Sequence, residues 1–131
     1  MAQMATEEAA AQVVSPAAQI STRLVQLFAK YAGRGPTMAR TTIDRDHVLV
    51  LVRNALTQAE QTLSDRGKEG VVLEGRQGLQ GAIRDEAIAM VEEIVGRKVV
   101  AFMSTNHLDP DIGAELFVLD SQDNGEPGPA G

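Results

Sequence analysis

The residues of this sequence that could do chemistry lie in three short segments. Asn106–Asp111 places one imidazole and two carboxylates in a single loop, a set that could bind a hard cation or transfer protons. His47 directly follows Asp46, and an imidazole beside a carboxylate can titrate near neutral pH. Arg34 and Arg40 flank a Gly-Pro turn and could together hold a phosphate or carboxylate.

Each of these segments also has a structural interpretation, which we favour. Asp and Pro are ordinary hairpin residues, and Asn106–Asp111 lacks the ligand density of a calcium loop. A lone histidine at a strand end is usually a surface residue, and arginines beside a turn are usually solvated. The chain has no cysteine, no nucleophile elbow and no phosphate loop. We therefore predict a non-enzymatic protein with no catalytic residue, metal or cofactor; the alternative is a small anion- or ligand-binding sensor or enzyme that uses Arg34 and Arg40.

The composition is that of one domain with an aliphatic core. Of 131 residues, 44% are hydrophobic but only 3% are aromatic, so no stacking platform for nucleic-acid bases is expected. The longest apolar run, Val48–Val52, is far shorter than the roughly 20 residues that span a bilayer. The first residues carry Glu7 and Glu8 instead of a basic signal region. We expect a soluble cytoplasmic protein without direct membrane insertion.

Charge is divided unequally along the sequence. Residues 21–56 hold six basic and two acidic side chains, whereas residues 57–119 hold six basic and eleven acidic ones. This polarity is a solvated surface, a pair of complementary faces for self-association, or one basic face for an anionic partner. Arg34, Arg40 and Arg45 are the predicted contacts for a partner or an anion.

Three helices are predicted. The first begins at Ser15-Pro16, an N-cap followed by proline, and ends at Gly33. A capping box of Thr57 and Glu60 starts a short helix that runs to about Ser64. The third spans about Glu69–Val95 and ends at Gly96. The apolar stripe of the first helix is Ile20, Leu24, Leu27, Phe28 and Tyr31.

The long helix carries a glycine at every third position of its first half. Gly75, Gly78 and Gly81 each cost up to about 1 kcal/mol relative to alanine in a helix interior. They mark either a close backbone approach to another element or a frayed segment.

Four strands complete an α-β-β-α-α-β-β order. They are predicted at Met38–Ile43, His47–Arg53, Lys98–Ser104 and Ala114–Leu119, with a loop over Thr105–Gly113. Two hairpins joined by helices predict an α+β two-layer domain over residues 16–120, in which helices pack on a four-stranded, largely antiparallel sheet. Residues 1–15 and 121–131 are predicted to be disordered tails.

The second strand is apolar on both faces. Val48, Val50 and Val52 point one way, and Leu49 and Leu51 the other. Such a strand either lies at the centre of a sheet that is covered on both sides or contributes to a subunit interface. Because so small a domain has few helices to cover two faces, we predict a homodimer that forms through Leu49 and Leu51.

Several motifs, taken in order, resemble the MpsC-like family, formerly a domain of unknown function. The family is named for a Na+-translocating membrane potential-generating system, and the resemblance covers about Ile20 to Leu119. The matching features are a helix ending in Gly33-Arg34-Gly35-Pro36, two adjacent strands, Leu56-Thr57-x-x-Glu60, a long helix beginning near Arg76, Gly96-x-Lys98-Val99 and the closing Phe117-Val118-Leu119.

The resemblance implies a small soluble bacterial protein that is an accessory of a membrane system for ion or inorganic-carbon transport. It implies no catalytic residue or cofactor. The matched positions have structural roles, with Gly33, Gly35 and Pro36 in a tight turn and Thr57 and Glu60 in a helix cap. The expected partners are a second copy of the chain and an integral membrane transport protein that holds it at the membrane periphery.

Overall fold

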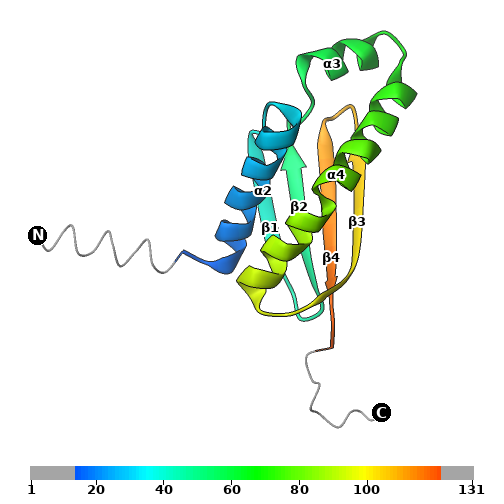
Figure 1. Ribbon diagram of the computed structural model, residues 1–131. Coiled ribbons are helices and arrows are strands. Elements are labelled where there is room, and N and C mark those ends of the chain that lie inside the picture. Colours follow the sequence, from blue (N-terminus) through cyan, green and yellow to red (C-terminus); the bar gives the residue numbers. More distant parts are fainter. Residues whose placement is uncertain (1–13, 122–131) are drawn as a thin grey trace, which may run out of the picture.

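The computed structural model describes residues 14–121 and arranges them as three helices and one four-stranded sheet (Figure 1). Apart from Val14, Ser15 and Ser121, the two predicted tails lie outside the described residues. The α+β class and the element order are confirmed. In chain order the elements are α2 (Pro16–Ala32), β1 (Met38–Ile43), β2 (His47–Arg53), α3 (Gln58–Asp65), α4 (Glu69–Val95), β3 (Val99–His107) and β4 (Ile112–Leu119).

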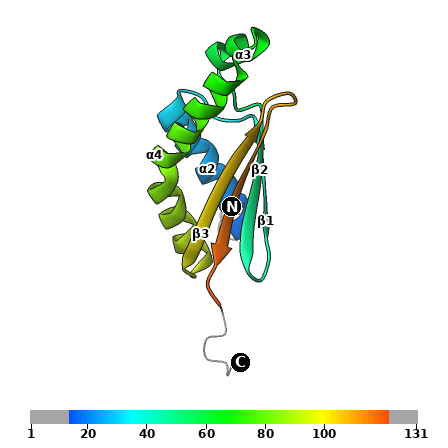
Figure 2. The same cartoon turned by 90° about the vertical axis from the view of Figure 1, so that its right-hand side faces the viewer.

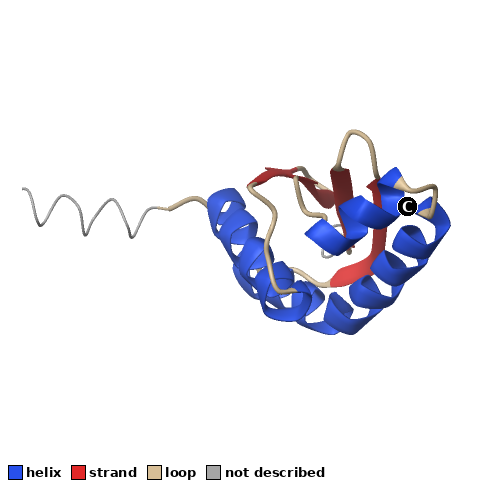
Figure 3. Ribbon diagram, turned by 90° about the horizontal axis from the view of Figure 1, so that it is seen from above, coloured by secondary structure: helices blue, strands red, loops and turns tan. Residues whose placement is uncertain are grey.

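The sheet is antiparallel throughout, with strand order β1-β2-β4-β3. β1 and β2 form one hairpin, β3 and β4 form another, and the β2–β4 pairing joins them. The two long helices, α2 and α4, lie along one side of the strands, and α3 stands at the end of the sheet where α4 begins (Figures 1 and 3). Helices and sheet therefore form two layers.

The helix ends follow from local side-chain chemistry. The Ser15 hydroxyl accepts a hydrogen bond from the Ala18 amide at 3.1 Å, which caps α2 ahead of proline at its first position. Gly33 ends this helix with a φ of 85°, a conformation that favours glycine. Both hydrogen bonds of the predicted capping box between Thr57 and Glu60 are present at the start of α3.

An aliphatic core fills the space between the helices and the sheet. Because side chains alternate along a strand, β2 sends every second residue to this inner face, and the same alternation in β4 does likewise. The buried apolar cluster consists of Ile20, Leu24, Phe28, Val48, Val50, Val52, Ala55, Ile83, Ala87, Met90, Val91, Val99, Phe117 and Leu119.

The second hairpin is longer than the sequence predicts. Residues 105–107 and 112–113, predicted to be loop, are paired strand residues, with Asn106 opposite Gly113 and His107 opposite Ile112. The polar character of this stretch indicated a loop, but backbone pairing with β4 keeps it extended. The turn that remains is closed by the His107 ring, whose Nδ1 lies 2.8 Å from the Pro110 carbonyl oxygen.

Two expectations for the helices need correction. Tyr31, predicted to lie in the apolar stripe of α2, is 40% exposed, because its hydroxyl reaches across to donate to Glu86 on α4. Gly75, Gly78 and Gly81 lie within one continuous helix, and a Cβ at any of them would meet no described atom within 4 Å. Neither a frayed segment nor a close backbone approach explains these glycines in the described chain.

Candidate functional site

The face of the sheet that points away from the helices is uncovered by any described element. Figure 2 shows α2 and α4 on one side of the strands and open space on the other. Leu49 and Leu51 of β2 point to this open face, as predicted from the alternation of the strand. We call this surface the open face.

Strand pairing builds the open face from apolar rows. Leu51 lies opposite Ala114, and Leu49 lies opposite Leu116. Leu116 pairs in turn with Met103 of β3, which is 51% exposed. The apolar residues of the open face are Met38, Leu49, Leu51, Ala101, Met103, Ile112, Ala114, Leu116 and Val118. A contiguous apolar surface of this kind, bordered by polar groups, is typical of an interaction site.

The two ends of the open face differ in charge. Arg53 ends β2 on this face, one row beyond Leu51. At the opposite end, His47 begins the same strand, and its Nδ1 lies 2.9 Å from the Asp46 carboxylate. The hydrogen bond with His47 lowers the pKa of Asp46, so this carboxylate is ionised at neutral pH.

The three arginines predicted to contact a partner or an anion do not share one site. Arg34 follows α2 and donates through Nη1 to the Leu56 carbonyl oxygen. Arg40 lies on the open face of the edge strand β1, opposite Leu51. Arg45 lies in the turn at the far end of β1, a strand of six residues that spans about 20 Å. Arg34 thus bonds to the backbone of another segment and lies at the opposite end of β1 from Arg45.

The segment between β2 and α3, residues 54–57, makes hydrogen bonds to three distant parts of the chain, and we call it the anchored loop. Its Leu56 carbonyl oxygen accepts from Arg34, and its Leu56 amide donates to the Asp111 carboxylate at 2.9 Å. Its Ala55 carbonyl oxygen accepts from Arg76 at 2.6 Å. The Gly-Arg-Gly-Pro turn and the long helix thus act on the same short loop.

The anchored loop is closed by a buried ion pair. Arg76 is 1% exposed and donates two hydrogen bonds to Glu60, through Nε at 2.9 Å and through Nη2 at 2.6 Å. Partial burial acts to raise the pKa of Glu60, but the hydrogen bonds from Arg76 and Thr57 outweigh it and lower that pKa. Glu60 therefore caps α3 and pairs with α4 through one carboxylate.

Close packing explains the glycine before the proline in the Gly-Arg-Gly-Pro turn. A Cβ at Gly35 would lie 2.8 Å from the carbonyl oxygen of Val25 on α2, so any side chain would push the turn away from the helix. Pro36, which follows, is buried. These positions hold Arg34 where it reaches the anchored loop.

A model of one protein family matches residues 14–121, the whole of the described structure. Its description is Na+-translocating membrane potential-generating system (MpsC). The chain belongs to the MpsC family. No curated protein and no solved structure matches it.

Three of the motifs that carried the resemblance to the MpsC family thus meet at the anchored loop. Leu56, Thr57 and Glu60 form the loop and its cap, and Arg34 and Arg76 hold it. Arg34 and Arg76 donate to backbone carbonyl oxygens of the loop, and Arg76 also forms the buried ion pair with Glu60.

Sequence reasoning missed a buried polar group in this MpsC-family domain. Arg76, Gln80 and Glu115 are at most 5% exposed. Two signals could have indicated it. Arg76 and Gln80 fall in the helical register of Ile83 and Ala87, and Glu115 alternates in phase with Phe117 and Leu119.

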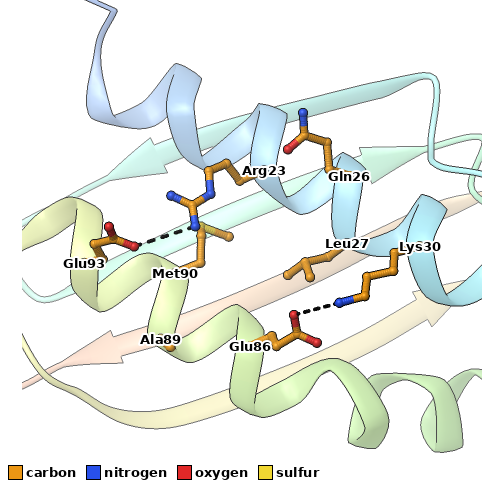
Figure 4. A pocket seen from close by; sticks show the side chains of 8 residues that line it. All are labelled: Arg23, Gln26, Leu27, Lys30, Glu86, Ala89, Met90 and Glu93. Carbon is orange, nitrogen blue, oxygen red and sulfur yellow. Dashed lines mark hydrogen bonds and ion pairs between the residues drawn. The ribbon is translucent and has the colours of Figure 1, made fainter.

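A groove of about 390 Å³ separates α2 from α4 on the outer surface of the helix layer (Figure 4). Leu27 and Met90 line it, and two ion pairs cross it. Arg23 pairs with Glu93 at 3.6 Å, and Lys30 pairs with Glu86 at 3.3 Å. These charges are therefore paired with one another across the groove and link α2 to α4 at the surface.

Among residues 14–121, no group of three or more His, Asp or Glu side chains is placed to hold a metal ion. None of the described helices combines the length and the apolar character that crossing a membrane requires. The loop Asn106–Asp111 instead uses Asp111 to bind the Leu56 amide.

Proposed function

We propose that this protein is a non-enzymatic accessory subunit of a membrane ion-translocating system and that it acts as a homodimer formed through the open face. The uncovered apolar face of the sheet is the single observation that carries this proposal. The description of the MpsC family supports the link to a Na+-translocating membrane system. The motif residues around the anchored loop make hydrogen bonds within the domain, which is consistent with an accessory role instead of a catalytic one.

Side-chain sizes on the open face suit a second copy of the chain. A two-fold axis that runs across the strands, between the Leu49 row and the Leu51 row, would place Leu49 of one copy over Leu51 of the other. The same axis would place Leu116 over Ala114, so a large side chain would meet a small one. Two sheets that interdigitate in this way form an ordinary two-sheet core.

Charge supports the same arrangement. The axis exchanges the two ends of the open face, so that Arg53 of one copy would approach the Asp46–His47 pair of the other. The reciprocal contact forms at the opposite end, as the symmetry of an isologous dimer demands. A parallel arrangement would instead place Arg53 against Arg53.

Sedimentation of the full chain over a range of concentrations tests the dimer. We expect the wild-type chain to sediment as a dimer and Leu49→Asp as a folded monomer, because the aspartate would be buried against a second apolar sheet. Leu73→Asp is the matched control, since Leu73 is a 39% exposed leucine on the outer side of α4. A monomeric wild-type chain, or a Leu49→Asp chain that remains dimeric, would refute the proposed interface.

Copurification from gently solubilised membranes tests the link to a membrane system. We expect the tagged chain to recover a specific integral membrane protein. Arg45→Glu is the informative variant for a basic contact, because Arg45 is exposed in the turn after β1, whereas Arg40 lies on the open face and Arg34 holds the anchored loop. Recovery of the chain alone would leave a free-standing homodimer and contradict the accessory role.

A further inference from the structure

The inner face of the sheet changes from apolar to polar beneath the first half of α4. In one row, Val48, Phe117 and Phe102 lie side by side, and the two phenyl rings are 4.9 Å apart. In the next row, Val50 pairs with Glu115, which pairs with Ser104. α4 contributes Arg76 and Gln80 to the buried interior at this end of the domain.

The polar groups in this layer are buried but incompletely paired. Both carboxylate oxygens of Glu115, the Ser104 hydroxyl and the Gln80 amide nitrogen are inaccessible to solvent and make no hydrogen bond. Arg76 directs its hydrogen bonds to Glu60 and Ala55. An ionised carboxylate can only accept hydrogen bonds, and leaving one unpaired in the interior is costly. A proton removes the charge and gives Glu115 a hydrogen to donate.

Burial sets the proton affinity of this group. Removal from water raises the pKa of Glu115 from 4.5 to about 7, against smaller opposing effects of the Ser104 hydroxyl and the Arg76 charge. The carboxyl therefore gains and loses its proton around neutral pH.

Among the described side chains that face Glu115, none of the others changes charge near neutral pH. From α4 the charged neighbour is Arg76, which is already paired with Glu60 of α3. β2 presents Val50 and β3 presents Ser104, and neither side chain changes charge near neutral pH.

The helix that covers Glu115 has few apolar contacts at this end. The first half of α4 contains Gly75, Gly78 and Gly81, and its apolar contacts are the buried Val72 and the partly buried Leu79. α3, which precedes it, contributes no buried residue. Few apolar contacts and several helix glycines lower the free energy needed to open a segment locally.

We propose that the Glu115 carboxyl, together with Ser104 and Gln80, is a buried proton-binding site that controls how the first half of α4 packs on the sheet. With the proton bound, the neutral carboxyl stays beneath the helix. When the proton leaves, the charged carboxylate favours an opened helix start that admits water. This site lies on the inner face of the sheet and does not depend on the dimer.

Amide hydrogen exchange of the full chain between about pH 5 and about pH 8 tests the site. After correction for intrinsic exchange, we expect opening of residues 69–81 to increase about 70-fold over this range and to level off above it. Residues 83–95 should not follow, because their buried contacts are apolar. Glu115→Gln should remove the pH dependence, whereas Glu74→Gln, which alters an exposed carboxylate on the same half-helix, should retain it.

Carbon NMR of the Glu115 carboxyl gives a second test that does not rely on a folded Glu115 variant. We expect a midpoint near neutral pH in the wild-type chain. Ser104→Ala should raise that midpoint, since the hydroxyl acts to lower the pKa. Titration of Glu115 in the range of ordinary glutamates, or pH-dependent opening that persists in Glu115→Gln, would overturn the proposal.

Discussion

Replacing Arg76 with methionine tests whether one buried guanidinium holds the anchored loop, α3 and the start of α4 together. Arg76 is 1% exposed, donates two hydrogen bonds to Glu60 and donates a third to the Ala55 carbonyl oxygen at 2.6 Å. Methionine fills similar space without these donors. It would leave a partly buried carboxylate without its counter-charge and a buried carbonyl without its donor.

The expected loss is about 3 to 4 kcal/mol, because removal of one member of a buried ion pair typically costs about 3–5 kcal/mol. That is a large share of the roughly 5–15 kcal/mol by which domains of this size are stable. Urea denaturation followed by circular dichroism measures the loss directly, and the midpoint of thermal unfolding should fall by about 15 °C.

Arg84→Met is the matched control for this experiment. Arg84 lies on the same helix, but its side chain is 52% exposed and pairs at 3.3 Å only with the neighbouring Asp85. Its replacement should change stability by no more than about 0.5 kcal/mol. Glu60→Gln combined with Arg76→Met should cost less than the two single changes together. A loss below about 1 kcal/mol in Arg76→Met would refute the anchoring role.

Three further predictions concern separate parts of the molecule. Gly78→Ala should stabilise the domain by about 0.5–1 kcal/mol in urea denaturation, because its Cβ meets open space and alanine favours the helix; a destabilised variant would contradict this. The free energy of unfolding should fall by about 3 kcal/mol as pH rises from 4.5 to about 7, since the pKa of Glu115 is raised and the folded state keeps a proton that the unfolded chain has released. Glu115→Gln should abolish that decline. Arg53→Glu should weaken the proposed dimer in sedimentation, and adding Asp46→Arg should restore it; an unaffected dimer in the single variant would exclude the two-fold arrangement.

Local signals in the sequence predicted most of the fold correctly. Ser15, Gly33 and the Thr57–Glu60 box set helix ends through hydrogen bonds to residues no more than four positions away. The alternation of Val48 and Leu49 assigned both faces of β2, since side-chain direction in a strand depends only on parity. The extended ends of the second hairpin were not predictable in this way, because β4 and not side-chain preference keeps Thr105–His107 in the sheet.

The buried polar side chains beneath α4 could not be predicted from the sequence, for a different reason. Arg76 and Glu115 carry charges that are usually solvated, so residue type predicted exposed side chains. Their positions in the helix and strand patterns predicted buried ones, and both are buried. Only the tertiary structure shows that Glu60 compensates Arg76 and that Glu115 remains without a hydrogen bond. Arg34 was similarly taken for a contact residue, and its hydrogen bond to Leu56 requires the folded chain.

The anchored loop also bears on the order in which the chain folds. Its hydrogen bonds join residues that are 21, 22 and 55 positions apart, to Arg76, Arg34 and Asp111 respectively. Closing such long segments costs chain entropy before the contact forms, so we expect these bonds to form after the hairpins and helices. Changes in the loop should then speed unfolding while leaving the folding rate almost unaltered. On this reasoning, we expect the anchored loop to set how long the native state lasts more than how quickly it is reached.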